Sequence, residues 1–161
     1  MAIDIKQTLT VIKDVLKRLD SKYYSDSAVD LIYHTGLVES RYKYLMQLGN
    51  PVARGFFQME GATARDICKN FLAHRPKLMG EIEKICYFNY FVLAKADIKE
   101  LEFLLTTNIA FSVIMCRIHY RRVPKALPKT LEEQAKYWKK YYNTKAGKGT
   151  VEKFLDICKK N

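Results

Sequence analysis

Three polar side chains with the chemistry of a catalytic or binding site fall close together between positions 34 and 64. Glu39 comes late in an expected helix, directly after two apolar residues. A carboxyl group held in apolar surroundings has a raised pKa and can act as a general acid near neutral pH. Gln58 and Glu60 stand in a short apolar segment, and strand alternation puts them on one face. Gln58 there can bind an amide or hydroxyl group of a ligand.

Each of these side chains also has an ordinary structural interpretation. Glu39 can be a solvent-facing helix residue, because carboxyl groups with a shifted pKa are the minority. Gln58 can occupy an exposed strand edge. Glu60 can place a negative charge at the N-terminal end of the next helix, where the helix dipole favours it. Spacing alone does not decide between the two interpretations.

The elements that would position these residues are a helix, a break, a short strand and a second helix. The pattern Ser27-x-x-Asp30 resembles a helix cap and predicts a helix to about residue 44, stopped by Gly49-Asn50-Pro51. The segment GFFQME, residues 55–60, predicts a strand in a small hairpin. A helix over about 62–73 follows. Such a break can hold side chains from two elements over one cleft.

The rest of the chain shows helical periodicity. Helices are predicted over 3–19, about 77–93, 98–120 and 130–142, and a last helix is capped by Thr150. The stretch 98–120 is apolar on most sides, which predicts a buried helix. The sequence therefore predicts a mostly α protein (α+β class) with one small β-hairpin, in a single domain over residues 1–161.

Composition limits the partners. A formal net charge of +11 in 161 residues implies an anionic partner: nucleic acid, a membrane surface or an anionic cell-wall polymer. The basic runs KYWKKYY and KAGKGTVEK suit any of these, or a solvated helix face. No helix-turn-helix or zinc pattern supports nucleic acid, so none is expected as a partner.

Metal, cofactor and disulfide chemistry are not indicated. The histidines lack metal-ligand spacing, so we expect them to be structural or at the surface, with no metal and no cofactor. Cysteines stand in apolar helical patterns without a CxxC pair, which predicts buried thiols. The first residues are amphipathic rather than a secretory signal, and no apolar run reaches the length of a membrane span. The four cysteines are Cys68, Cys86, Cys116 and Cys158.

The motif residues together resemble the soluble lytic transglycosylases and goose-type lysozymes. Those families carry a helical Glu-Ser, then G-L-M-Q, then x-T-A at the start of the next helix. Here Glu39-Ser40, Gly55-Phe56-Phe57-Gln58 and Ala62-Thr63-Ala64 stand at matching spacing. Gly61 is a departure, since many members have proline there.

A looser match follows downstream. Tyr142-Asn143 followed by Gly147, Gly149, Val151 and Lys153 resembles the family signature Y-N-A-G-x-G-x-V, with a two-residue insertion. The surrounding phrases HYRRVP and YWKKYYNT also resemble phage-encoded proteins of this lysozyme-like superfamily.

The resemblance implies a lysozyme-like fold and cleavage of the β-1,4 bond between N-acetylmuramic acid and N-acetylglucosamine in peptidoglycan. Glu39 would be the general acid. Gln58 and a tyrosine, Tyr142 or alternatively Tyr120, would position the sugar. Further substrate contacts are expected from Ser40, Asn143 and the tyrosines Tyr42 and Tyr44.

The same resemblance leaves hydrolysis and transglycosylation open. In a lytic transglycosylase the first carboxylate also acts as base, and the muramic 6-hydroxyl closes an anhydro ring. In an inverting hydrolase a second carboxylate, here Glu60, would activate a water, which requires the Glu39 and Glu60 carboxyl groups to lie roughly 6.5–9.5 Å apart.

The expected setting is a phage lysis enzyme or a virion-associated enzyme. It would be made in the cytoplasm of the infected bacterium, or carried in the virion, and would act on the wall as a monomer. Its partners would be peptidoglycan and, through its charge, anionic wall polymers. Two other hypotheses stay open: a non-catalytic lysozyme-like module and a basic nucleic-acid-binding protein.

Overall fold

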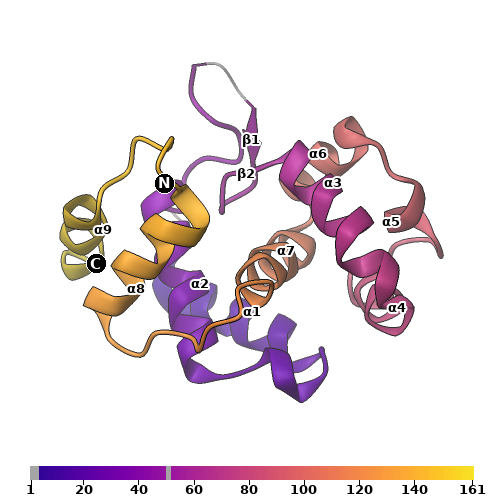
Figure 1. Cartoon of the computed structure of the whole chain (residues 1–161), viewed down its shortest axis with the longest axis horizontal. Coiled ribbons are helices and arrows are strands. Elements are labelled where there is room, and N and C mark those ends of the chain that lie inside the picture. The colour runs from indigo at the N-terminus through magenta and orange to yellow at the C-terminus, as the bar shows by residue number, and fades with distance from the viewer. Residues whose placement is uncertain (1–3, 50–51) are drawn as a thin grey trace.

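The computed structural model describes residues 4–49 and 52–161, which are mostly helical with one small antiparallel hairpin (Figure 1). This confirms the predicted mostly α class and the predicted hairpin. The elements are α1 (Ile5–Lys17), η1 (Ser21–Tyr23), α2 (Asp26–Glu39), β1 (Ala53–Arg54), β2 (Met59–Glu60), α3 (Gly61–Asn70), η2 (Leu72–His74), α4 (Pro76–Ile85), α5 (Val92–Lys95), α6 (Ile98–Thr107), α7 (Ile109–Arg121), α8 (Leu131–Trp138), η3 (Lys139–Asn143) and α9 (Val151–Lys159).

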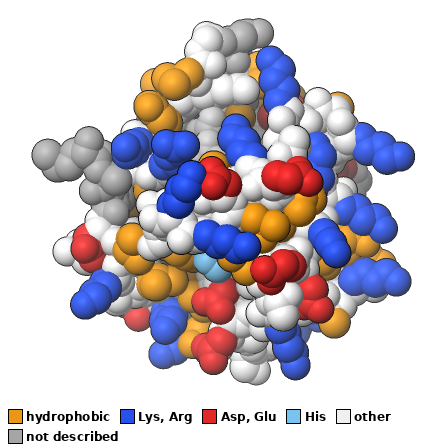
Figure 2. All heavy atoms as spheres, turned by 90° about the vertical axis from the view of Figure 1, so that its left-hand side faces the viewer, with side chains coloured by type: hydrophobic (Ala, Val, Ile, Leu, Met, Phe, Trp, Pro, Cys, Tyr) orange, Lys and Arg blue, Asp and Glu red, His pale blue; other side chains and the backbone are white. Residues whose placement is uncertain are grey.

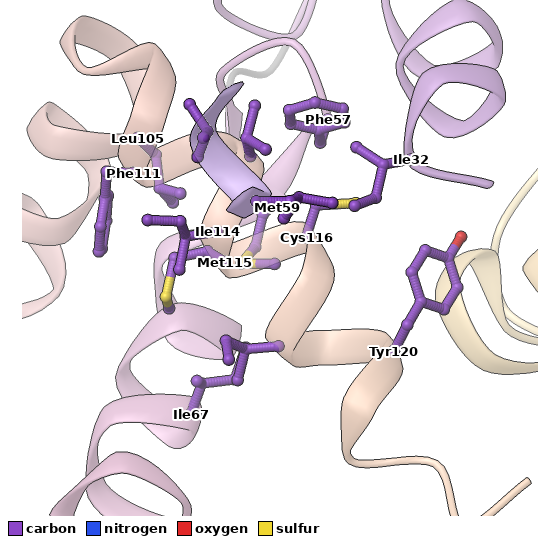
Figure 3. Close-up of a cluster of buried hydrophobic side chains, with 14 of the residues drawn as sticks. Ile32, Phe57, Met59, Ile67, Leu105, Phe111, Ile114, Met115, Cys116 and Tyr120 are labelled. Atoms are coloured by element: carbon purple, nitrogen blue, oxygen red, sulfur yellow. The ribbon is translucent and has the colours of Figure 1, made fainter. Parts of the chain in front are cut away.

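Helix α7 runs through the middle of the molecule (Figure 1) and packs against α1, α2, α3, α4 and α6. Residues 111–118 are all buried, as expected for a helix that is covered on nearly all sides. Figure 3 shows Met59 of the hairpin beside Cys116 of α7, within the buried cluster that also contains Phe57 and Ile114. The hairpin is therefore fixed to the core by its own apolar side chains.

The predicted helix over 98–120 is two helices, because the chain bends by 113° at Asn108. The Asn108 side chain caps α7 by accepting a hydrogen bond from the Phe111 backbone N–H, and its amide also donates to the Cys86 carbonyl. No single helix among residues 4–49 and 52–161 is long and apolar enough to cross a membrane. The bent pair α6 and α7 meets that test together, by length and composition only.

Helix α2 differs from its prediction at both ends. It is capped by the Ser25 hydroxyl rather than Ser27, and it ends at Glu39 rather than near residue 44. The chain reverses there, since Arg41 and Tyr42 take left-handed φ angles of 53° and 52°. Asn50 and Pro51, part of the predicted stop, lie outside the described residues.

Towards the C-terminus, the predicted Thr150 cap of α9 is confirmed, since its side chain accepts the Lys153 backbone N–H. The predicted helix 130–142 keeps α geometry only to Trp138 and continues as the π-helical turn η3. Helix α9 packs on α2 and α8 around a small second core of Ala135, Trp138 and Phe154.

Candidate active site

The Glu39 carboxyl lies at the C-terminal end of α2, partly buried. Burial raises its pKa from about 4.5 to about 7. Two groups oppose this rise by stabilising the carboxylate: the Trp138 indole N–H, which donates to Oε1 at 2.9 Å, and the nearby Lys153 ammonium. Glu39 therefore changes its protonation state near neutral pH, which is a property that a general acid needs.

A cleft of about 770 Å³ opens over this carboxyl. Its walls come from the end of α2, the segment 44–48, the hairpin, the start of α3, the turn η3 and the loop 144–149. Of the residues predicted for the site, Glu39, Gln58, Glu60, Tyr142 and Asn143 all line it, and so does Tyr44. The structure thus brings side chains from distant parts of the chain to one concave surface.

Gln58 is held by a turn rather than by a strand. Residues 55–58 form the turn between β1 and β2, and Gln58 takes a positive φ of 48°. Its side-chain amide donates to the Gly55 carbonyl at 2.8 Å. The predicted alternation is wrong for this segment, because Phe56 and Phe57 are both buried. Gln58 and Glu60 nevertheless both line the cleft.

Gly55 has a structural reason to be glycine. Its φ is 70°, and a Cβ atom there would collide with the Leu105 carbonyl and the Ser112 hydroxyl. Only a residue without a side chain lets the turn approach α6 and α7 this closely. Contact with α6 and α7 consequently fixes the position of the turn that carries Gln58.

Glu60 is exposed and occupies the N-cap position of α3, without a side-chain capping hydrogen bond. It lines the cleft together with Glu39. Both sequence-based interpretations of Glu60 therefore persist: a charge at a helix N-terminus, and a second carboxylate facing a bound ligand.

Tyr142 and Asn143 form the opposite wall. The Tyr142 hydroxyl donates to the Phe57 carbonyl at 2.7 Å, which ties η3 to the hairpin turn. The His119 ring stands edge-on to the Tyr142 ring, with centroids 5.1 Å apart. Burial lowers the pKa of His119 to about 4, so this cleft-lining imidazole is neutral at physiological pH.

Three predicted substrate contacts lie elsewhere, and their assignment is corrected. Tyr120 is 1% exposed, and its hydroxyl shares a hydrogen bond with Thr35. Because α2 ends at Glu39, Tyr42 folds back under the helix, where its hydroxyl donates to the Tyr33 carbonyl. Ser40 is 2% exposed and bonds to the backbone of the same turn. These side chains build the support of the site rather than its surface.

Sequence reasoning missed Trp138 and Lys153 as neighbours of Glu39. It treated the segment 136–142 as a basic run, and Trp138 is separated from Glu39 by 99 positions. One signal was present: Trp138 is the only tryptophan of the chain, and a buried indole needs an acceptor for its N–H.

No protein-family model, no curated protein and no solved structure matches the chain. Within the two described ranges, no group of three or more His, Cys, Asp and Glu side chains could hold a metal ion.

Proposed function

We propose that the protein is a peptidoglycan-cleaving glycosidase of lysozyme-like type, with Glu39 as its general acid. The observation that carries the proposal is a partly buried carboxyl group in a large cleft, with its pKa raised to about 7. Protonated at neutral pH, Glu39 would donate its proton to the glycosidic oxygen as the bond to the sugar breaks.

The surroundings of Glu39 suit the charge that this step leaves behind. Once the proton has moved, the carboxylate accepts the Trp138 N–H and lies near the Lys153 ammonium. Donors that are already in place stabilise a developing charge without reorganisation. Gln58, Tyr142 and Asn143 would contact the sugar and its N-acetyl group.

The second half of the reaction has two candidate routes. In a transglycosylase, the Glu39 carboxylate takes the proton of the muramic 6-hydroxyl, and an anhydro ring closes. In a hydrolase, Glu60 activates a water from across the cleft. Both routes use a carboxylate that lines the same hollow.

The decisive test compares wild type with Glu39→Gln in turbidity loss of purified cell walls. Removing a general acid typically lowers the rate on the order of 10²–10⁴-fold. Glu132→Gln is a matched control, since that exposed side chain pairs with exposed Lys159. Equal activity of wild type and Glu39→Gln would refute the assignment, and an inactive wild type would favour a non-catalytic module.

Mass spectrometry of the released fragments then separates the two routes. Anhydro-muramic ends indicate a transglycosylase and reducing ends indicate a hydrolase. Glu60→Gln is expected to abolish activity only in the second case.

A further inference from the structure

Hydrogen bonds from a single lysine side chain hold the loop 144–149 in place. The Lys139 ammonium donates to Asn143 Oδ1 at 2.8 Å, to the Thr144 carbonyl at 2.8 Å and to the Gly147 carbonyl at 2.9 Å. An ammonium group has three N–H donors, so Lys139 places all of them on this loop and its border. Hydrogen bonds from a charged donor are about twice as strong as neutral ones.

The fastened loop covers the indole of Trp138. A Cβ atom on Gly149 would collide with the outer edge of that ring, and one on Gly147 would collide with Asn143. The loop backbone therefore lies in direct contact with Trp138, and both positions require glycine. On its other side the loop forms one wall of the cleft, with Thr144, Ala146, Gly147, Lys148 and Gly149 among the lining residues.

The π-helical turn η3 brings the lysine to this position. Lys139 is its first residue and Asn143 its last, directly after Trp138 at the end of α8. Single π-helical turns are rare and are frequent at functional sites. The turn carries Lys139, Tyr142 and Asn143, so the fastening group and the cleft wall belong to the same element.

We propose that Lys139 is a positioning residue: its ammonium holds the loop 144–149 over Trp138, so that the indole keeps its place against Glu39. The effect of this positioning on catalysis rests on the proposed function, whereas the hydrogen bonds that hold the loop over Trp138 do not depend on it. Without the three hydrogen bonds the loop would leave the indole, and the Glu39 carboxyl, which already lines the cleft, would be more exposed to water.

Lys139 is not among the charged and titratable groups whose interaction with Glu39 shifts a pKa in the described part of the chain. Those groups are Lys153 from α9, Cys116 and Tyr120 from α7, and Tyr142 from η3. A change at Glu39 in a Lys139 variant therefore reports the loop rather than a lost charge partner.

The sole tryptophan supplies a readout that needs no activity. Since the Trp138 N–H donates to Glu39, its fluorescence should titrate with that carboxyl, with a midpoint near 7 in wild type. In Lys139→Met we expect a red-shifted emission, stronger quenching by acrylamide and a midpoint lower by about one pH unit. Solvation of the carboxylate lowers its pKa, and burial affects this pKa more than the Trp138 hydrogen bond does, so the loss of that donor only partly offsets the fall.

Lys140→Met is the matched control. Lys140 is the exposed neighbour whose ammonium lies over the Tyr141 ring, away from the loop contacts of Lys139. Its titration and quenching should equal those of wild type. A cooperative unfolding transition in both variants shows that the comparison is made on folded protein. Unchanged emission, quenching and midpoint in folded Lys139→Met would overturn the proposal.

Activity gives a second, separable readout. If Glu39 acts as an acid, a midpoint lowered by about one unit reduces the protonated fraction at pH 7 about five-fold, with little loss near pH 5. A variant that is merely destabilised would lose activity at both of these pH values. Altered fluorescence in Lys139→Met with an inactive wild type would support the fastening and refute the glycosidase. If wild type is active but the fluorescence and the pH profile of Lys139→Met are unchanged, the glycosidase proposal is supported and the proposed role of Lys139 is refuted.

Discussion

The Glu39 carboxyl binds its proton more tightly in the folded chain than in the unfolded one, because burial raises its pKa from about 4.5 to about 7. The difference between these pKa values corresponds to about 3 kcal/mol. Since the folded state has the higher pKa, protonated Glu39 stabilises the fold below about pH 4.5 relative to higher pH. This stabilisation is lost as the pH rises through about 7.

The variant Glu39→Gln is consequently expected to be more stable than wild type in alkaline solution. At about pH 8 its free energy of unfolding should exceed that of wild type by as much as about 3 kcal/mol, and at about pH 4 the two should be similar. Urea unfolding at both pH values measures this, with Glu132→Gln as control. A constant difference at the two pH values would contradict the raised pKa.

At the residue scale, the sequence predicted those side chains that belong to a motif of residues close together along the chain. Glu39, Gln58 and Glu60 stand within 22 positions of one another in a recognisable motif. The contact of Glu39 with Trp138 and the role of Lys139 depend on long-range packing and on a π-helical turn. Helical periodicity does not reveal such features, and the single tryptophan indicates that an acceptor is needed without identifying it.

The bend at Asn108 shows why element boundaries escaped the sequence. Apolar residues continue on both sides of it, so the pattern indicates one helix. The structure instead uses the asparagine as the cap of α7 and as a donor to Cys86. A capping residue inside an apolar run starts a new helix only when that helix can pack in a different direction from the one before it. Here the new helix packs in the centre of the core.

Asn108→Ala is expected to destabilise the protein by about 1–2 kcal/mol, because both side-chain hydrogen bonds are lost at a helix start. Thermal unfolding is a suitable measurement. Asn108→Asp keeps the cap but loses the donor to Cys86, so its loss should be smaller. Asn89→Ala, at an exposed loop position, is the control. An effect of Asn108→Ala no larger than that of Asn89→Ala would show that the cap is dispensable.

The hairpin segment was predicted as an element but not in its geometry. Its turn carries two positive φ angles, at Gly55 and Gln58, and buries neighbouring phenylalanines. An alternating strand cannot do this. Aromatic content gave the correct location, whereas the turn conformation follows from contact with α6 and α7.

For the molecule as a whole, the dominant feature is its charge. Figure 2 shows lysine and arginine side chains spread over the face that carries α8 and α9, with carboxylates and apolar side chains between them. The net charge of +11 favours association with anionic polymers through long-range attraction. The positive charge on this surface is dispersed rather than gathered into one patch.

Binding of the Glu39→Gln variant to purified cell walls should therefore weaken as salt is added. Between about 20 mM and about 500 mM NaCl we expect the bound fraction in a pelleting assay to fall several-fold, because salt screens exposed charges. Walls stripped of anionic polymers should show a smaller dependence on salt. Binding that ignores both changes would point to contacts in the cleft alone.

The 99 positions between Glu39 and Trp138 also set the order in which the cleft can form. During synthesis, α2 and the hairpin are complete long before α8 and the loop that follows it. Until those segments emerge, the Glu39 carboxyl lacks both its indole donor and the wall that shields it from water, so its pKa stays near that of a solvated glutamate. A nascent chain thus holds an ordinary carboxylic acid, and the raised pKa of Glu39 arises only when the two distant segments meet.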